Sequence, residues 1–160
     1  MATDPSAPVS ARDYAALTAG WTSLLGAVLF GARDRGEEPI KPIETIPLGV
    51  ATFALAKLIS KEKITAPERA LFLDEHRNPK GTGLRYAVGD LLGCTRCVGM
   101  WAALGLTGLR VTRPREARVV TTLLGATAVN DFLQGCFTWT SARTNVAQVV
   151  EQRERESVPA

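Results

Sequence analysis

The chain has 160 residues, of which 46% are hydrophobic and 6% aromatic, and its formal net charge is +3. That length suits one domain, because two separate cores would each be marginal. The charge does not indicate a nucleic-acid partner, since the sequence has neither a recognition motif nor a basic face with stacking aromatics. We expect no cleavable signal peptide, and three cysteines in such a chain argue against a disulfide scaffold.

Charged residues are nearly absent from four segments and crowded between them. The four segments are 14–31, 43–56, 97–109 and 119–139. This banded pattern predicts an all-α fold: a small membrane helical bundle of three to four apolar helices with a basic interfacial loop. The alternative is a helical domain that is soluble or lies on the membrane surface. We expect a disordered N-terminal tail over 1–12, a helical membrane domain over 13–140 and a polar C-terminal tail over 141–160.

The first helix is predicted over 14–31, where about eighteen residues without charge suffice to cross a hydrocarbon core. Small residues recur every four positions along it, and such a stripe lets two helix backbones approach closely in lipid. The stripe consists of Ala15, Ala19, Ser23, Ala27 and Gly31. Chance in an alanine-rich sequence is the alternative explanation.

The segments that follow alternate between charged and apolar. Residues 32–42 read as a loop, and 43–60 as a short second helix. Residues 57–85 carry the densest group of basic side chains, with a short helix beginning near Pro67. These cations either meet anionic lipid headgroups or only solvate the loop. Their excess predicts a multi-pass protein of the cell membrane with this loop on the cytoplasmic side.

The third and fourth helices are predicted over 86–109 and 119–139, with 110–118 as a tight basic connector. The third carries the sequence GDLLGCTRCVGMW at 89–101. If the last two helices form an antiparallel hairpin, Cys136 and Asp131 lie at the level of the two cysteines of this motif.

Two sequence blocks resemble a known family. The first block contains Lys57, Ile64, Pro67, Arg69 and Phe72, and the second contains Gly89, Asp90, Leu91, Leu92, Cys94, Cys97, Gly99 and Trp101. On these residues, residues 48–135 resemble domain-of-unknown-function family 1360, small bacterial integral membrane proteins that include a sporulation-associated branch. The chain departs from the pattern in having Asp90 where Glu is usual, and Thr95 and Arg96 where Pro and an aromatic are usual. The resemblance implies a helical membrane fold and no particular activity.

Cys94 and Cys97 are one helical turn apart, so both thiols face the same way. They could form a redox pair, or bind zinc with Cys136 and the single histidine, His76. The alternative is that cysteine serves as a small packing residue, which extends the series of Gly89 and Gly93. We expect no resident cofactor, with zinc as the alternative.

A polar face on the last helix forms a second candidate site. It contains Asn130, Asp131 and Gln134 at helical spacing, flanked by Thr127 and Thr138. In lipid such a face turns to the bundle interior or to water. Asp131 and Asp90 near each other could form a proton relay. Pairing of Asp90 with Arg96, or a helix N-terminal position for Asp90, is the alternative.

These features predict a small membrane-embedded structural or interaction protein, a subunit or scaffold of a membrane complex. Its partners would be membrane lipids and either another protein or a second copy. The alternative is a thiol-redox or metal-binding membrane protein that uses Cys94 and Cys97. The sequence holds no Ser-His-Asp set, phosphate loop or metalloprotease helix. Its single histidine offers little for conventional acid–base catalysis.

Overall fold

The computed structural model describes residues 9–33 and 40–157, with side chains as far as residue 146. Its elements are α1 (Ala11–Arg33), η1 (Pro42–Glu44), α2 (Thr45–Ser60), η2 (Lys63–Thr65), α3 (Ala66–Ala70), α4 (Leu84–Gly93), α5 (Thr95–Thr112) and α6 (Pro114–Ser157). Every named element in the described residues is helical, which confirms the predicted all-α fold.

The contacts divide the chain into two compact units, one ending at Gly125 and the other beginning at Ala126. The first unit contains α1 to α5 and the start of α6. The second contains the rest of α6, so much of the expected polar tail over 141–160 is helical, as far as Ser157. Most of the expected N-terminal tail, residues 1–8, lies outside the described residues.

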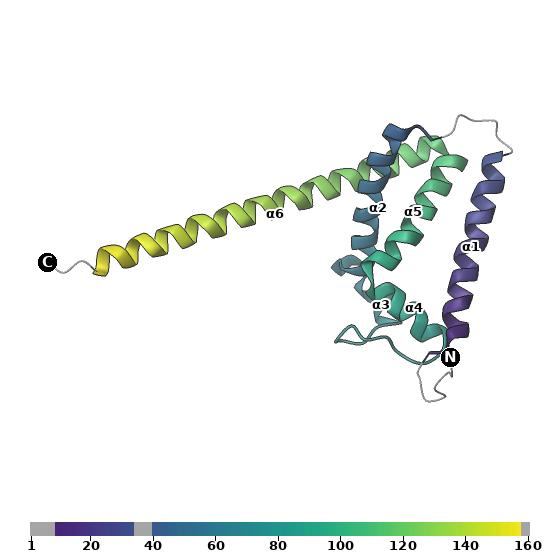
Figure 1. Ribbon diagram of the computed structural model, residues 1–160, viewed down its shortest axis with the longest axis horizontal. Coiled ribbons are helices and arrows are strands. Elements are labelled where there is room, and N and C mark those ends of the chain that lie inside the picture. Colours follow the sequence, from purple (N-terminus) through teal and green to yellow (C-terminus); the bar gives the residue numbers. More distant parts are fainter. Residues whose placement is uncertain (1–8, 34–39, 158–160) are drawn as a thin grey trace. The chain divides into compact units, whose positions relative to one another are not determined.

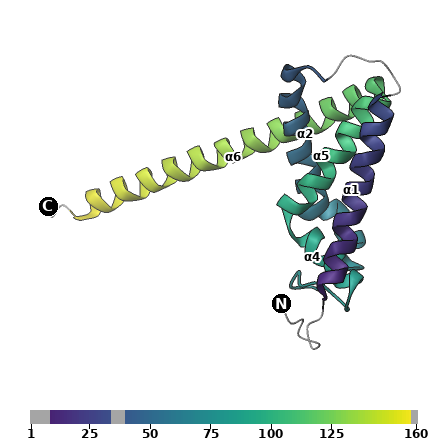
Figure 2. The same cartoon turned by 45° about the vertical axis from the view of Figure 1, so that its right-hand side comes forward.

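In the first unit α1, α2 and α5 lie side by side (Figures 1 and 2), with α5 packed on α2 and α1 packed on α4 and α5. The buried residues between α2 and α5 are mostly small, as Ala51, Ala54 and Ala102 illustrate. Gly99 also faces Ala56, because a Cβ atom added to it would lie 3.9 Å from the Ala56 Cβ. Small side chains at the contact let the helix backbones approach closely.

Polar contacts mark the two ends of this helix layer. At one end the Tyr14 hydroxyl donates to the Asp90 carboxylate at 2.8 Å, and the hydroxyls of Ser60 and Thr95 are 2.9 Å apart. We call this the junction end. At the far end Arg110 donates to Glu44 at 2.8 Å. Because α1 starts at the junction end and α2 finishes there, the two helices are antiparallel.

The predicted continuous helix over 86–109 is wrong, because the structure breaks it at Cys94. Cys94 has an extended backbone (φ −97°, ψ 104°) and is the N-cap of α5. Its Sγ accepts the Cys97 backbone N–H at 3.4 Å, which supplies one of the bonds that the first turn of a helix lacks. Gly93 just before it has a weak helix propensity. The chain therefore forms α4 and α5 in place of one long helix.

Two helical segments, rather than three to four, are long and apolar enough to be candidate membrane spans among the described residues. They are Ala11–Arg33 and Pro42–Ser60, with mean hydropathies of 1.5 and 1.4. The segment α5 is less apolar, since its 18 residues include Arg96 and Arg110. The number of apolar helices expected from the sequence is corrected accordingly.

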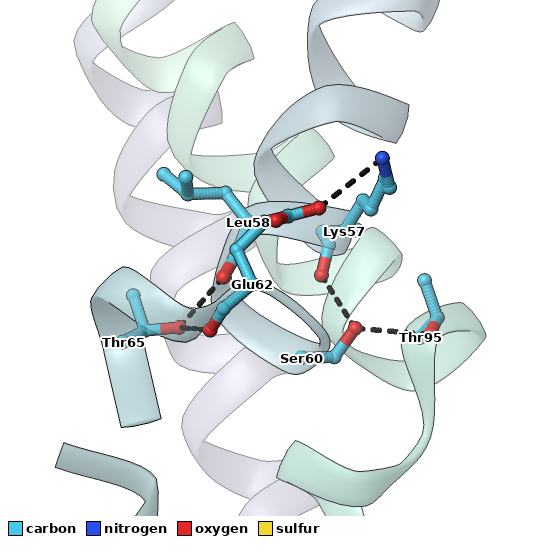
Figure 3. Close-up of polar contacts among 7 residues, drawn as sticks. Lys57, Leu58, Ser60, Glu62, Thr65 and Thr95 are labelled. Atoms are coloured by element: carbon cyan, nitrogen blue, oxygen red, sulfur yellow. Dashed lines mark hydrogen bonds and ion pairs between the residues drawn. The ribbon is translucent and has the colours of Figure 1, made fainter. Parts of the chain in front are cut away.

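Side chains of the basic segment cap the C-terminal end of α2. The Thr65 hydroxyl donates to the Leu58 carbonyl at 2.7 Å (Figure 3). Arg69 donates to the Ile59 carbonyl at 2.9 Å and to the Thr65 hydroxyl. The last carbonyls of a helix have no partner within it, so cations and hydroxyls placed there satisfy them. Arg69, one of the residues behind the family resemblance, thus has a structural role.

Other basic side chains of the segment make similar bonds. Arg77 donates to the Ser60 carbonyl, Lys80 to the Ala70 carbonyl at 3.1 Å and Arg85 to the Leu71 carbonyl at 2.7 Å. The segment expected to solvate a loop or meet lipid therefore also fixes the path of the chain between α2 and α4. The short helix predicted near Pro67 is α3, which ends at Ala70.

Candidate functional site: the thiol pair at the α4–α5 junction

Cys94 and Cys97 come together at the start of α5. The Cys97 thiol donates to the Cys94 sulfur with a Sγ–Sγ distance of 2.8 Å. Cys94 is half-buried and Cys97 is exposed. The two sulfur atoms come together at the helix break and not on a continuous helical face.

The environment makes the two thiols unequal. The hydrogen bond from the Cys97 thiol, together with the Cys97 backbone N–H, lowers the pKa of Cys94 below its usual 9.0. The same sulfur–sulfur contact, with partial burial, raises the pKa of Cys97 to about 11. Both residues lie outside the two candidate membrane spans. Since the thiolate is the reactive form, Cys94 is the better nucleophile of the pair.

A groove of about 260 Å³ opens beside Cys97, between α1, α4 and α5. Its walls are mainly apolar and aromatic. They are formed by Tyr14, Leu17, Thr18, Trp21, Asp90, Leu91, Cys97, Met100 and Trp101. The Trp21 indole N–H donates to the Met100 carbonyl at 3.4 Å, which ties α1 to α5 within the groove. The groove can therefore take an apolar group next to a sulfur atom.

Asp90 lies at the rim of this groove and accepts the hydrogen bond from Tyr14 described above. Its side chain is exposed, as is that of Arg96. The partner of Asp90 is therefore Tyr14 of α1, where the sequence offered Arg96 as an alternative to a proton relay. The negative charge of Asp90 contributes to raising the pKa of Cys97 and works against the lowering at Cys94.

His76 is exposed in the first unit, whereas the remaining residues of the predicted thiol and polar sites lie in the second unit. Cys136 is exposed there, as are Asn130 and Gln134, while Asp131 is half-buried. A third thiol for the Cys94 pair, and a relay between Asp131 and Asp90, stay predictions. In the part of the chain that the structure describes, no three His, Cys, Asp or Glu side chains are placed to hold a metal ion.

Most of the predicted small-residue stripe on α1 faces away from its neighbours, but Ala27 lines a groove with Trp101 and Leu104 of α5. Ala15, Ala19, Ser23 and Ala27 are exposed and Gly31 is half-buried. Packing of this stripe against another helix stays a prediction. Within the unit, α1 meets α5 through the neighbouring face, where Gly20 lies against Trp101 and Val28 against Gly108.

The two glycines expected to pack helices lie in different surroundings. A Cβ atom on Gly89 would lie 2.7 Å from the Phe72 carbonyl oxygen and 3.1 Å from the Pro79 side chain, so this position has room only for hydrogen. Gly93 has no such neighbour within 4 Å. Gly89 therefore lets α4 approach the loop after α3, and not another helix.

The contribution of α1 to the groove was missed in the sequence. Tyr14, Leu17 and Trp21 recur at the spacing of one helical face, and that periodicity was the available signal. The sequence analysis assigned helix packing to the small-residue stripe, which lies on another face of the same helix.

Comparison with known proteins identifies the family. Residues 47–137 match the sequence profile of a protein of unknown function (DUF1360). The chain belongs to this family. The resemblance expected over 48–135 is confirmed, and the DUF1360 region includes all three cysteines and the basic segment but not α1. The sporulation protein YjcA of Bacillus subtilis (strain 168) is 33% identical over 97 residues, which are 53% of this chain and 82% of that protein. No solved structure matches the chain.

Proposed function

We propose that this DUF1360 protein is a small integral membrane protein, embedded through α1 and α2, that serves as an interaction subunit of a membrane complex. The main support is that the large apolar side chains of α1 are exposed on the surface of the chain. None of the residues of α1 is buried. Leu24, Leu29 and Phe30 are 51%, 57% and 70% exposed.

This distribution is the reverse of that expected for a water-soluble core. The largest fully buried side chain among the described residues is that of Ser60, and the core holds mostly alanines with a few leucines. Burying one Leu or Phe side chain contributes about 1.5–3 kcal/mol, so a soluble fold would gain by turning such residues inward. Contiguous exposed apolar surface marks a membrane or protein contact.

The second candidate span has the same pattern. Ala51 and Ala54 of α2 face α5 and are buried, while Ile46, Val50 and Phe53 are exposed. Small residues between helices and large residues toward the surroundings are typical of helices in lipid, where packing replaces the hydrophobic effect. The large side chains then contact acyl chains at no desolvation cost.

Lysine substitution at two exposed apolar positions tests the embedding. Phe53 lies in the middle of α2 and Ile64 just beyond it in η2, and they are 57% and 75% exposed. In water both Phe53→Lys and Ile64→Lys would be tolerated. In lipid only Phe53→Lys would be harmful, because a lysine at the centre of a membrane helix costs about 2.5–3.5 kcal/mol.

The measurement is the amount of each variant that remains in membranes after carbonate extraction. We expect the wild type and Ile64→Lys to stay in the pellet and Phe53→Lys to be depleted. Release of the wild-type chain by carbonate, or equal retention of the two variants, would contradict embedding through α2.

The exposed stripe of α1 supports the interaction role, because its small residues leave room for a second helix backbone. Ala19→Phe should disrupt an assembly that survives in mild detergent, whereas Leu29→Phe, at an exposed position off the stripe, should not. Sedimentation of the purified chain measures the assembly. A wild-type monomer without a stable partner would count against the interaction role but not against embedding.

A further inference from the structure

The break at Cys94 allows the two cysteines to approach each other. In an unbroken helix, residues three apart have Cβ atoms about 5–6 Å apart, whereas a disulfide needs about 3.5–4.5 Å. The extended backbone of Cys94 places its sulfur over the first turn of α5, where Sγ of Cys97 lies 2.8 Å away. A disulfide bond is about 2.05 Å long, so a small side-chain movement could close it.

We propose that Cys94 and Cys97 form a dithiol–disulfide couple that reduces an apolar disulfide bound in the groove beside Cys97, with Cys94 as the attacking thiol and Cys97 as the resolving thiol. The site goes beyond the proposed membrane function and does not depend on it. It is built from three helices, since α4 and α5 supply the junction while α1 closes the groove through Tyr14 and Trp21.

The exchange has two steps. Cys94, as the thiolate, attacks the sulfur that carries R in a disulfide R–S–S–R′. A mixed disulfide forms between the Cys94 sulfur and that sulfur, and R′S⁻ leaves. Cys97 then loses its proton and attacks the Cys94 sulfur, which closes the internal disulfide and expels RS⁻. The pair gives up two electrons, the substrate disulfide takes up both, and the two released thiolates take up two protons from the pair and the solvent.

The lining of the groove sets the class of substrate. Leu17, Trp21, Leu91 and Trp101 offer apolar and aromatic surface, and Asp90 at the rim disfavours an anionic group. A neutral disulfide with apolar or aromatic substituents therefore fits better than a charged one. The probe chosen here is 2,2′-dithiodipyridine, a neutral aromatic disulfide that releases a coloured thione at each step.

The order of attack is tested with single serine variants in the full-length chain. All measurements use a Cys136→Ser background, because Cys136 is exposed and would react independently. Serine keeps an acceptor at the N-cap of α5, so Cys94→Ser is expected to retain the fold, and circular dichroism checks this. We expect the parent to release two thiones per chain, and Cys97→Ser to release one and retain a mixed disulfide visible by mass spectrometry.

Cys94→Ser should react more slowly than Cys97→Ser at pH 7. In Cys97→Ser the remaining thiol keeps the bond from the backbone N–H at position 97, which lowers the pKa of Cys94, whereas in Cys94→Ser partial burial and the charge of Asp90 still raise the pKa of Cys97. Equal rates for the two variants, or a parent chain in which the mixed disulfide persists, would overturn the proposal. Neither outcome bears on membrane embedding, which carbonate extraction decides separately.

The groove is tested by comparing the rates at which the chain reduces 2,2′-dithiodipyridine and bis(2-hydroxyethyl) disulfide. Each rate is divided by the rate at which glutathione reduces the same disulfide, which corrects for the intrinsic reactivity of the reagent. We expect a preference of about tenfold for the aromatic disulfide, which is the size of effect that burial of one aromatic ring can supply. Trp21→Ala should abolish the preference. Trp139→Ala, which changes an exposed tryptophan of the second unit, is the matched control. A preference unaffected by Trp21→Ala would exclude the groove as the substrate site.

Discussion

At the level of single residues, Cys94 has the largest consequences for the candidate site. Cys94 follows the last residue of α4 and is the N-cap of α5. Its sulfur accepts hydrogen bonds from the Cys97 thiol and the Cys97 backbone N–H, and both bonds lower the pKa of Cys94. The Cys-x-x-Cys spacing predicted that both thiols would face the same way. It could not predict how α4 is placed, because Gly89 packs against Phe72 and Pro79, a contact distant in sequence.

Asp90→Asn should shift the reactivity of Cys94 to lower pH. The carboxylate charge of Asp90 raises the pKa of both thiols, so its removal lowers them and increases the thiolate fraction at any pH below the pKa of Cys94. The rate of alkylation by iodoacetamide, measured against pH in the Cys136→Ser background, gives the midpoint. We expect a lower midpoint for Asp90→Asn and an unchanged one for Glu75→Gln, an exposed carboxylate in the loop after α3. An unchanged midpoint for Asp90→Asn would show that its charge does not act on the pair, and a higher one would contradict the sign of its effect.

Gly89→Ala should destabilise the first unit, while Gly93→Ala should not. The added Cβ atom at position 89 would lie 2.7 Å from a backbone oxygen, and such overpacking typically costs about 1–3 kcal/mol. At position 93 there is free space, and alanine is favoured over glycine in a helix by about 1 kcal/mol. Thermal unfolding in detergent compares the two variants. Equal melting temperatures would mean that the loop at Phe72 does not pack on α4 as described.

At the level of elements, runs without charge predicted α1 and α2 well. The predicted helix over 14–31 is part of α1 (Ala11–Arg33), and the one over 43–60 contains α2 (Thr45–Ser60). The segment between α2 and α4 was harder to predict, because its basic side chains form bonds to helix ends that charge patterning does not reveal. Composition suggested solvent or lipid contact, whereas Arg69, Arg77 and Arg85 donate to backbone carbonyls.

Arg69→Met should lower the stability of the α2–α3 connection. Loss of the guanidinium leaves the Ile59 carbonyl without its charged donor, and a hydrogen bond to a charged group is worth about 1.5–3 kcal/mol. Lys63→Met, which removes an exposed cation from the same stretch, should change the stability little. Hydrogen exchange at the end of α2, together with the melting temperature, measures the effect. If both variants behave alike, the effect of Arg69 would be due to charge rather than to capping.

At the level of the whole molecule, the antiparallel course of α1 and α2 in the first unit constrains its topology in a membrane. If both helices cross, the start of α1 and the basic segment after α2 lie on one side, and the segment before α2 lies on the other. Lys and Arg are retained on the cytoplasmic side of membrane proteins. The junction end, with the thiol pair, is therefore expected to face the cytoplasm, where thiols are kept reduced and a dithiol can act as a reductant.

Cysteine labelling tests this topology in a chain whose three native cysteines are replaced by serine. Lys41 precedes α2 and Lys63 follows it, and both are exposed, so a thiol at either position is accessible in the folded chain. We expect a membrane-impermeant maleimide to label Lys41→Cys in intact bacterial cells and to label Lys63→Cys only after the cells are opened. The two positions are separated by α2 alone, so opposite labelling requires that this helix crosses the membrane. Labelling of both from outside, or of neither, would mean that α2 lies along one face, and the reverse pattern would place the thiol pair in the oxidising compartment.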